Sequence, residues 1–308
     1  MSADTARVYR LTLGMTVSAG IAFYLAWPFS FITPVLAAKL LSLPKVMPPK
    51  AAIAFVGLLG GSFIVSAKLL LPTLAYPAVH LLVIGLILFH LFYARAGGAN
   101  PLLVVFALIG VMAIPLIGTA SLSLAEGVAW GLTFAAFIAV AMVYLAAAVF
   151  PDPPDLGPTV ATTEEVKEAK AEKPAPPPPR IRAALAFRSW IVIYPLYAAF
   201  LFFSRVDMAV VLIFAALLGL EANFGKHWAA GKGMILANLV GGLVAVVLFN
   251  LLVWVPAFPF FLLLMVLAGL VVGQLIFSGS TLGTLLAGGI TTVFIVLGPT
   301  LTGDAEAG

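Results

Sequence analysis

The sequence contains no cysteine, which excludes disulfides, thiolate zinc sites, iron–sulfur clusters and cysteine nucleophiles. Charge is also scarce, because Asp, Glu, Lys and Arg make up 9% of the 308 residues while 63% are hydrophobic. A soluble globular domain carries roughly 25% charged residues, so this chain has too few to cover a surface that faces water. We therefore expect an integral membrane protein of the all-α, polytopic class.

Eleven apolar runs are candidates for transmembrane helices, because about 20 apolar residues cross a hydrocarbon core of about 30 Å. The runs are continuous rather than alternating, which favours helices over barrel strands. The second and eighth runs are short, and Pro28 and Pro34 bracket the second, so we expect tilted or broken helices there. The runs cover residues 11–28, 29–44, 51–71, 75–94, 101–118, 124–150, 184–203, 206–222, 230–253, 257–277 and 281–301.

The distribution of positive charge predicts the orientation, since Lys and Arg gather on the cytoplasmic side. With the N-terminus inside, fourteen of the sixteen basic residues fall in cytoplasmic segments, and only Lys68 and Arg205 lie outside. We expect a multi-pass protein of the bacterial inner (cytoplasmic) membrane, with a cytoplasmic N-terminus and a periplasmic C-terminus. The apolar run from Leu11 has no small-residue cleavage site, so we interpret it as a retained helix rather than a signal peptide.

Residues 151–182 differ from the rest of the chain in being Pro-rich and charged, with almost no large apolar residue. Such a segment cannot bury enough apolar surface to fold, and its PAPPPP stretch is typical of polyproline II. We expect a disordered cytoplasmic linker, which is either a plain tether or a docking site for a partner. It separates a first transmembrane repeat of six helices, residues 1–150, from a second of five, residues 183–308.

The two halves share a pattern. Each begins with basic residues before a span, continues through a short apolar segment and a basic loop, and then reaches a glycine pair. Gly60 and Gly61 match Gly241 and Gly242 at an offset of 181 residues. Because each half starts on the cytoplasmic side, we expect parallel rather than inverted repeats. Parallel duplication is typical of transporters with a pathway between the halves, and a duplicated scaffold without transport is the alternative.

An Arg before the first span, a short second span ending in TPVLAAKLLSLP and a GLLGG cluster in the third span carry a family resemblance. The pattern resembles the fusaric acid resistance and aromatic acid exporter family of bacterial inner-membrane proteins, especially a compact branch of unknown function. The resemblance covers both halves outside the linker and implies export of aromatic or other small organic acids. Larger members carry a cytoplasmic domain after each helical set and work with a periplasmic adaptor protein. Here only the linker remains, and the second half lacks a sixth span.

Ionisable and amide groups at membrane depth are expensive and are functional candidates by default. Lys39 could hold a carboxylate as a point charge. A His titrates near neutral pH and suits proton coupling, and Glu221 is a carboxylate at the cytoplasmic end of the eighth run. The candidate substrate pathway consists of Lys39, His80, His90, Glu221, Asn223, Asn238 and Gln274.

Each candidate has a plainer interpretation. Lys39 is close enough to an interface to snorkel, and the histidines can donate to backbone carbonyls. Asn238 and Gln274 can hydrogen-bond a neighbouring helix, and Glu221 can be a loop-end charge near Lys226. The glycines expected to let helices approach closely, or to line a narrow pathway, are Gly57, Gly60, Gly61, Gly241 and Gly242.

No enzyme motif is present in the sequence. The AAGKGM stretch lacks the Walker spacing, which argues against direct ATP drive, and there is no HExxH or GxSxG motif. We expect neither a cofactor, a metal nor a nucleic-acid partner. The leading hypothesis is a secondary transporter for proton-coupled efflux of small organic (aromatic) acids. The alternative is a non-transporting membrane scaffold or assembly subunit. Beyond the lipid bilayer and an organic anion, the candidate partners are a periplasmic adaptor protein and further copies of the chain.

The topology can be tested with reporter fusions. A reporter after Gly308 is expected to report the periplasm, and one inserted near Lys170 the cytoplasm, because the charge bias holds the basic loops inside. Alkaline phosphatase and green fluorescent protein give opposite readouts on the two sides. Both positions reporting the same side would contradict the eleven-span topology.

Overall fold

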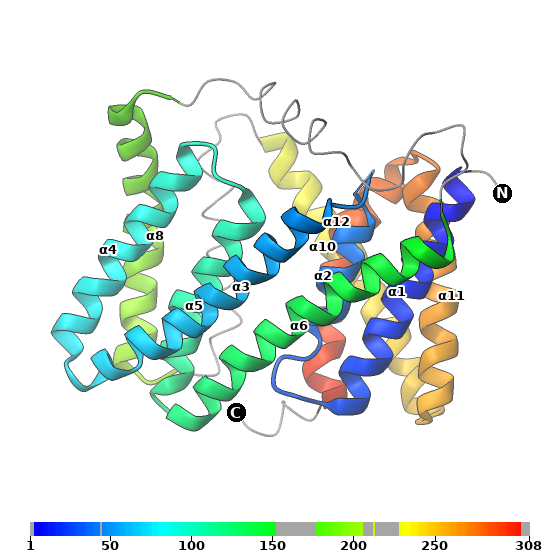
Figure 1. The fold of residues 1–308 in the computed structure, drawn as a ribbon, viewed down its shortest axis with the longest axis horizontal. Helices are drawn as coiled ribbons and strands as arrows, with labels where there is room; N and C mark the ends of the chain where they lie inside the picture. The colour runs from blue at the N-terminus through cyan, green and yellow to red at the C-terminus, as the bar shows by residue number, and fades with distance from the viewer. Residues whose placement is uncertain (1–2, 44, 152–176, 206–211, 213–227, 303–308) are drawn as a thin grey trace. The chain divides into compact units, whose positions relative to one another are not determined.

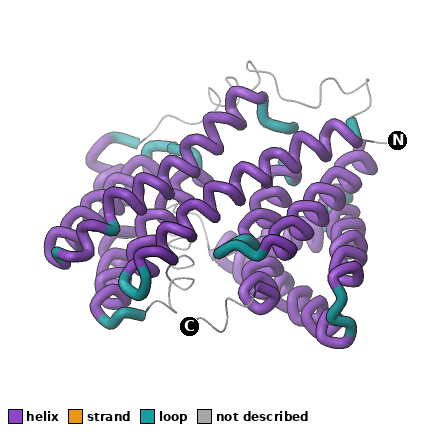
Figure 2. Tube along the Cα trace, turned by 60° about the horizontal axis from the view of Figure 1, so that its bottom comes forward, coloured by secondary structure: helices purple, strands orange, loops and turns teal. Residues whose placement is uncertain are grey.

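The computed structural model describes residues 3–43, 45–151, 177–205, 212 and 228–302 (Figure 1). These residues are helical throughout apart from turns and short loops, without a β-strand (Figure 2). This confirms the all-α class. It follows from the bilayer as solvent, because a helix satisfies its own backbone hydrogen bonds where no water can.

The described part of the chain forms ten α-helices and one 3₁₀ turn. Four helices begin with proline, which is tolerated at the first helical position because the missing N–H has no intrahelical partner there. The bounds are α1 Ala3–Leu25, α2 Ile32–Leu41, α3 Pro49–Leu70, η1 Pro72–Ala75, α4 Pro77–Ala96, α5 Pro101–Gly118, α6 Leu122–Val149, α8 Pro179–Phe202, α10 Trp228–Trp254, α11 Phe258–Phe277 and α12 Thr281–Thr302.

Eight helical segments within the described residues are long and apolar enough to cross a membrane, so the chain is a multi-pass membrane protein. The expected span at 29–44 is corrected, because α2 has 10 residues, about 15 Å of helix, and cannot cross alone. Pro34 does not end α2 but lies in its first turn, where a lost N–H costs no helical bond. The expected span at 206–222 lies outside the described residues except for Leu212.

The junction between linker and second half also differs from expectation. Helix α8 begins at Pro179, inside the segment 151–182 that composition assigns to the linker. The last proline of the PAPPPP stretch serves as the first helical residue, and Arg180 and Arg182 after it are good helix formers. Composition alone therefore places this boundary a few residues late. Residues 152–176 lie outside the described part.

The chain divides into two compact units, each drawn from both halves of the sequence. The first unit comprises Met1–Ile53, Phe134–Ala169 and Trp228–Ala307, and the second comprises Ala54–Thr133, Lys170–His227 and Gly308. The boundaries fall inside α3 and α6.

In the first unit, helices distant in sequence are neighbours. Helix α1 packs against α2 and α11, and α12 packs against α2, α10 and α11. Gly269 and Gly273 on α11 allow the close approach of α1, because a Cβ at Gly269 would lie 2.9 Å from the Thr12 Cα. Helices α2 and α12 run antiparallel, since Phe31 contacts Gly298 while Lys39 reaches Ala287.

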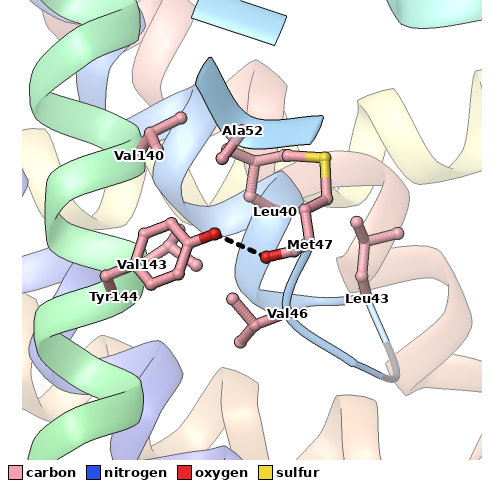
Figure 3. A pocket seen from close by; sticks show the side chains of 8 residues that line it. All are labelled: Leu40, Leu43, Val46, Met47, Ala52, Val140, Val143 and Tyr144. Carbon is pink, nitrogen blue, oxygen red and sulfur yellow. Dashed lines mark hydrogen bonds between the residues drawn. The ribbon is translucent and has the colours of Figure 1, made fainter. Parts of the chain in front are cut away.

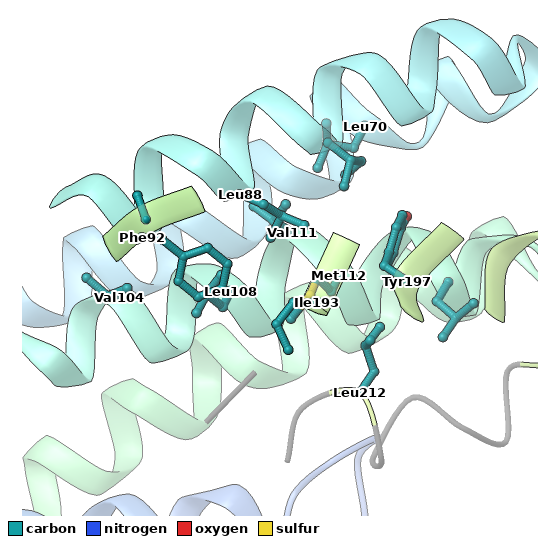
Figure 4. Close-up of a cluster of buried hydrophobic side chains, with 13 residues drawn as sticks. Leu70, Leu88, Phe92, Val104, Leu108, Val111, Met112, Ile193, Tyr197 and Leu212 are labelled. Atoms are coloured by element: carbon teal, nitrogen blue, oxygen red, sulfur yellow. The ribbon is translucent and has the colours of Figure 1, made fainter. Parts of the chain in front are cut away.

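In the second unit, α4 packs against α5, α8 and η1, and α5 also contacts α8. A buried apolar cluster fills the space between these helices (Figure 4). Leu88 and Met112 are fully buried, and Tyr197 of α8 is buried among them. Each fully buried aliphatic or aromatic side chain stabilises the packed state through close contacts, since lipid tails are no less apolar than the core.

Candidate functional site

Lys39 lies in the last turn of α2 and directs its ammonium onto α12. Its Nζ donates to the backbone oxygen of Ala287 over 3.0 Å, and the side chain is part-buried. Ala287 is the seventh residue of the 22-residue helix α12, about 7 Å along the axis from the helix centre. The charge therefore contacts an internal turn of an apolar helix rather than its end, and a charge at such depth is a functional candidate.

Asn238 of α10 is tied to α12 one turn further along. The Thr292 hydroxyl donates to Asn238 Oδ1 over 2.7 Å. This is a side-chain bond between neighbouring helices, of the kind that stabilises helix association in membranes. Thr292 and Ala287 are five residues apart and so lie about 140° apart around α12. Lys39 and Asn238 thus approach α12 from different sides.

The glycines expected in packing divide by position. A Cβ at Gly60 would lie 2.5 Å from Thr133 Cγ2, and one at Gly241 would meet the backbone of Gly289 on α12. The positions of Gly57, Gly61 and Gly242 have nothing within 4 Å of such a Cβ. One member of each pair therefore lies at a close helix approach, and the other faces away from the described neighbours.

His80 of α4 is fully buried within a hydrogen-bonded chain. Its Nδ1 lies 2.7 Å from Thr73 Oγ1, and its Nε2 lies 2.7 Å from the Tyr197 hydroxyl. Thr73 donates its only proton to the Leu70 carbonyl, so it must accept from His80 Nδ1–H. A neutral ring then accepts from Tyr197 at Nε2, and all partners are satisfied. Protonation would leave the Tyr197 proton without its acceptor.

His90 and Gln274 are exposed on their helices, in contrast to His80. His90 Nδ1–H donates to the Leu86 carbonyl of its own helix over 2.8 Å. This is the hydrogen bond to a backbone carbonyl that we gave in the sequence analysis as the plainer interpretation of the histidines. The two histidines of α4 therefore occupy different environments. Glu221 and Asn223 lie outside the described residues, as does Lys226.

One ion pair was missed by reasoning from the sequence. Glu126, in the first turns of α6, accepts a hydrogen bond from Lys68 at the end of α3 over 2.7 Å. Its signal was a carboxylate near the start of a long apolar run, but only the fold brings it to Lys68. The two side chains are 46% and 63% exposed, and exposed pairs of this kind contribute little stability.

A small apolar pocket lies in the first unit, beneath the loop that joins α2 to α3 (Figure 3). Its volume is about 10 Å³, the lower limit for one water molecule. The Tyr144 hydroxyl donates to the Met47 carbonyl and fixes the loop against α6 (Figure 3). The lining residues are Leu40, Leu43, Val46, Met47, Ala52, Val140, Val143 and Tyr144.

The fold and these contacts define a multi-pass α-helical membrane protein in which a lysine ammonium contacts an internal turn of an apolar helix. Residues 7–146 match a family model described as "Protein of unknown function (DUF2955)". The match covers most of the first expected repeat and names no activity. No curated protein matches the chain, and no solved structure matches it.

The two glycines of the α10 pair are expected to respond oppositely to alanine. Gly241→Ala puts a methyl group against the Gly289 backbone, and such overpacking costs about 1–3 kcal/mol. Gly242→Ala meets nothing within 4 Å and gains helix propensity. Thermal unfolding in detergent should show a lower Tm for the first variant and an equal or higher Tm for the second. Equal Tm values for both would contradict the close crossing.

The hydrogen-bonded chain at His80 can be tested through Tyr197. Tyr197→Phe leaves the buried Nε2 without its donor, which costs about 1–3 kcal/mol. Tyr194→Phe on the same helix is the control, because its hydroxyl makes no hydrogen bond within the described residues and its ring stack with Trp190 is kept. The Tm of the purified protein, measured by thermal unfolding, should fall only in the Tyr197→Phe variant. A matching loss in the control would refute the arrangement.

Proposed function

We propose that the protein is an inner-membrane secondary transporter that exports small organic, including aromatic, acids in exchange for protons. The observation that carries the proposal is the Lys39 ammonium, held on the carbonyl of Ala287 in the interior of α12. A carbonyl is a weaker partner for an ammonium than a carboxylate is, since ionised acceptors form roughly twice as strong a bond. An organic anion therefore competes well for this cation.

The basic residues near Lys39 support entry of an anion from one side. Lys45 follows α2 in the loop to α3, and Lys50 is exposed at the start of α3. In the proposed orientation these cations face the cytoplasm together with Lys226 and Lys232. They raise the local concentration of anions at the mouth of a low-dielectric site, and Lys39 then holds the carboxylate.

The helix contacts support the proposed duplication. If α1, α4 and α5 correspond to α8, α11 and α12, the contact of α1 with α11 is the counterpart of that of α8 with α4. The contact of α4 with α5 likewise corresponds to that of α11 with α12. Each unit then takes its first helix from one half and its fourth and fifth helices from the other. Such repeats are typical of transporters.

The coupling proton is better suited to His90 than to His80. Protonating His80 would leave the Tyr197 hydroxyl proton without its acceptor, whereas His90 bonds to the Leu86 carbonyl of its own helix through Nδ1. Glu221 is the further candidate from the sequence. A periplasmic adaptor protein is proposed as the partner that receives the exported acid.

A membrane scaffold or assembly subunit is the second candidate. The observation that favours it is the size of the described pocket, which at about 10 Å³ holds no organic acid. Accumulation of aromatic and aliphatic acids in cells with and without the protein separates the two functions. A scaffold leaves every acid of the panel unchanged.

Lys39→Ala is expected to lower export of a transported acid about tenfold, because a hydrogen bond to a charged group contributes about 1.5–3 kcal/mol. Lys45→Ala is the matched control and should lower export less, because this residue lies in the loop and steers anions. Initial rates of export are measured at equal protein level in the membrane. Equal, negligible losses in the two variants would mean that Lys39 only anchors α2.

A further inference from the structure

Thr291 carries a buried hydroxyl that lacks a hydrogen-bond partner among the described residues. A threonine inside a helix can donate to the carbonyl four residues earlier, which for Thr291 is that of Ala287. Ala287 O instead accepts from Lys39 Nζ. The ammonium thus binds the carbonyl that a threonine at this position could use, and the hydroxyl of Thr291 has no partner.

Helix geometry brings the two donors close together. The carbonyl of residue 287 points along the axis toward the N–H of residue 291, so the Lys39 ammonium lies over the turn that carries Thr291. Side chains four residues apart share one face, with Cβ atoms roughly 5–6 Å apart. Helix α2 packs against α12, and both helices belong to the first unit.

The neighbouring hydroxyls do not have this combination. Thr292 is satisfied across the helix interface by Asn238. Thr33 is also buried without a partner, but it precedes Lys39 by six residues and so lies about 240° away around α2. Thr291 is thus distinguished by an unused proton beside a cation.

We propose that Lys39 Nζ and Thr291 Oγ1 form a two-point site for the carboxylate of the transported acid, between α2 and α12. This rests on the proposed function and adds its ligand chemistry. One carboxylate oxygen accepts from the ammonium and the other from the hydroxyl. A carboxylate is acceptor-only with two oxygens, so it satisfies both donors at once.

The depth of the site suits transport. Thr291 is the eleventh of the 22 residues of α12, which places its turn at the middle of the helix. Substrate sites of secondary transporters lie near the bilayer midplane. Lys39 is only part-buried, so a ligand can reach the ammonium. Its three N–H donors allow it to bind the carboxylate while it keeps or releases Ala287 O.

Adjacent threonines provide a matched test, because valine has the same shape and lacks the hydroxyl. Thr291→Val removes an unsatisfied buried group, so Tm without ligand should stay equal or rise. The Kd for benzoate, measured by ligand-induced thermal shift of the purified protein, should rise about tenfold. The KM for benzoate export in proteoliposomes should rise in parallel.

Thr292→Val is the control. It leaves Asn238 Oδ1 without its donor, so Tm without ligand should fall while the Kd for benzoate stays within about twofold. Benzamide tests the ligand class, because it has the same ring without the charge. Wild-type protein should show no thermal shift with benzamide.

The outcomes separate the two proposals. An unchanged benzoate Kd in Thr291→Val, equal binding of benzamide, or no benzoate binding by the wild type overturns the two-point site. Binding that depends on Thr291 in a protein that exports none of the acids supports the site and overturns the transporter. Export without dependence on Thr291 supports the transporter and overturns the site.

Discussion

The absence of water in the hydrocarbon core is the constraint on which this structure depends. Every backbone N–H and C=O must find a partner within the protein, so the apolar runs become helices. Polar side chains face the same demand, and some of the described ones meet it on their own helix: Thr12 donates to Val8, and Asn250 donates to Val246. Lys39 instead donates to a carbonyl of another helix, and the buried hydroxyl of Thr291 has no partner, a state that it shares with Thr16, Ser30 and Thr33. The proposed ligand would satisfy the hydroxyl of Thr291.

The short helix α2 brings a charged side chain to an internal turn of an apolar helix. Its ten residues are too few to cross the bilayer, so its last turn meets an internal turn of α12 instead of an interface. The pair of antiparallel contacts, Phe31 with Gly298 and Lys39 with Ala287, fixes that register. Further round α12, the glycines at 241 and 289 bring α10 close and the bond from Thr292 to Asn238 holds it there. Helix α12 is thereby positioned from two sides, by α2 and by α10.

The sequence predicts the helices well and the site only in part. Continuous apolar runs determine α3 to α6 and α10 to α12 to within about two residues, since length and hydropathy decide a membrane helix. They overestimate α2, because apolar residues around Pro34 continue beyond the helical turns. Lys39 was identifiable as a charge in an apolar run. Its partner was not, since Ala287 offers only a backbone atom. Thr291 could not be singled out from the sequence, because nothing in the sequence shows which hydroxyls lack a partner. Glu126 could not be paired from the sequence either, because its partner Lys68 lies 58 residues earlier.

The exchange of helices between the two halves has a consequence for how the chain folds. Helix α1 ends at Leu25 and its neighbour α11 begins at Phe258. Helix α1 is synthesised first and can pack against α11 only after most of the chain has been made. Helix α4 can likewise pack against α8 only after the second half has begun to be synthesised. Closing such long loops costs conformational entropy before any helix contact compensates for it. The membrane lowers this cost, because each inserted helix spans the bilayer and moves only within its plane. The first 150 residues alone cannot complete either unit, because α1 then lacks α11 and α4 lacks α8. The contact between α2 and α12 likewise needs both halves of the chain, because the Lys39 ammonium comes from one half and the Ala287 carbonyl from the other.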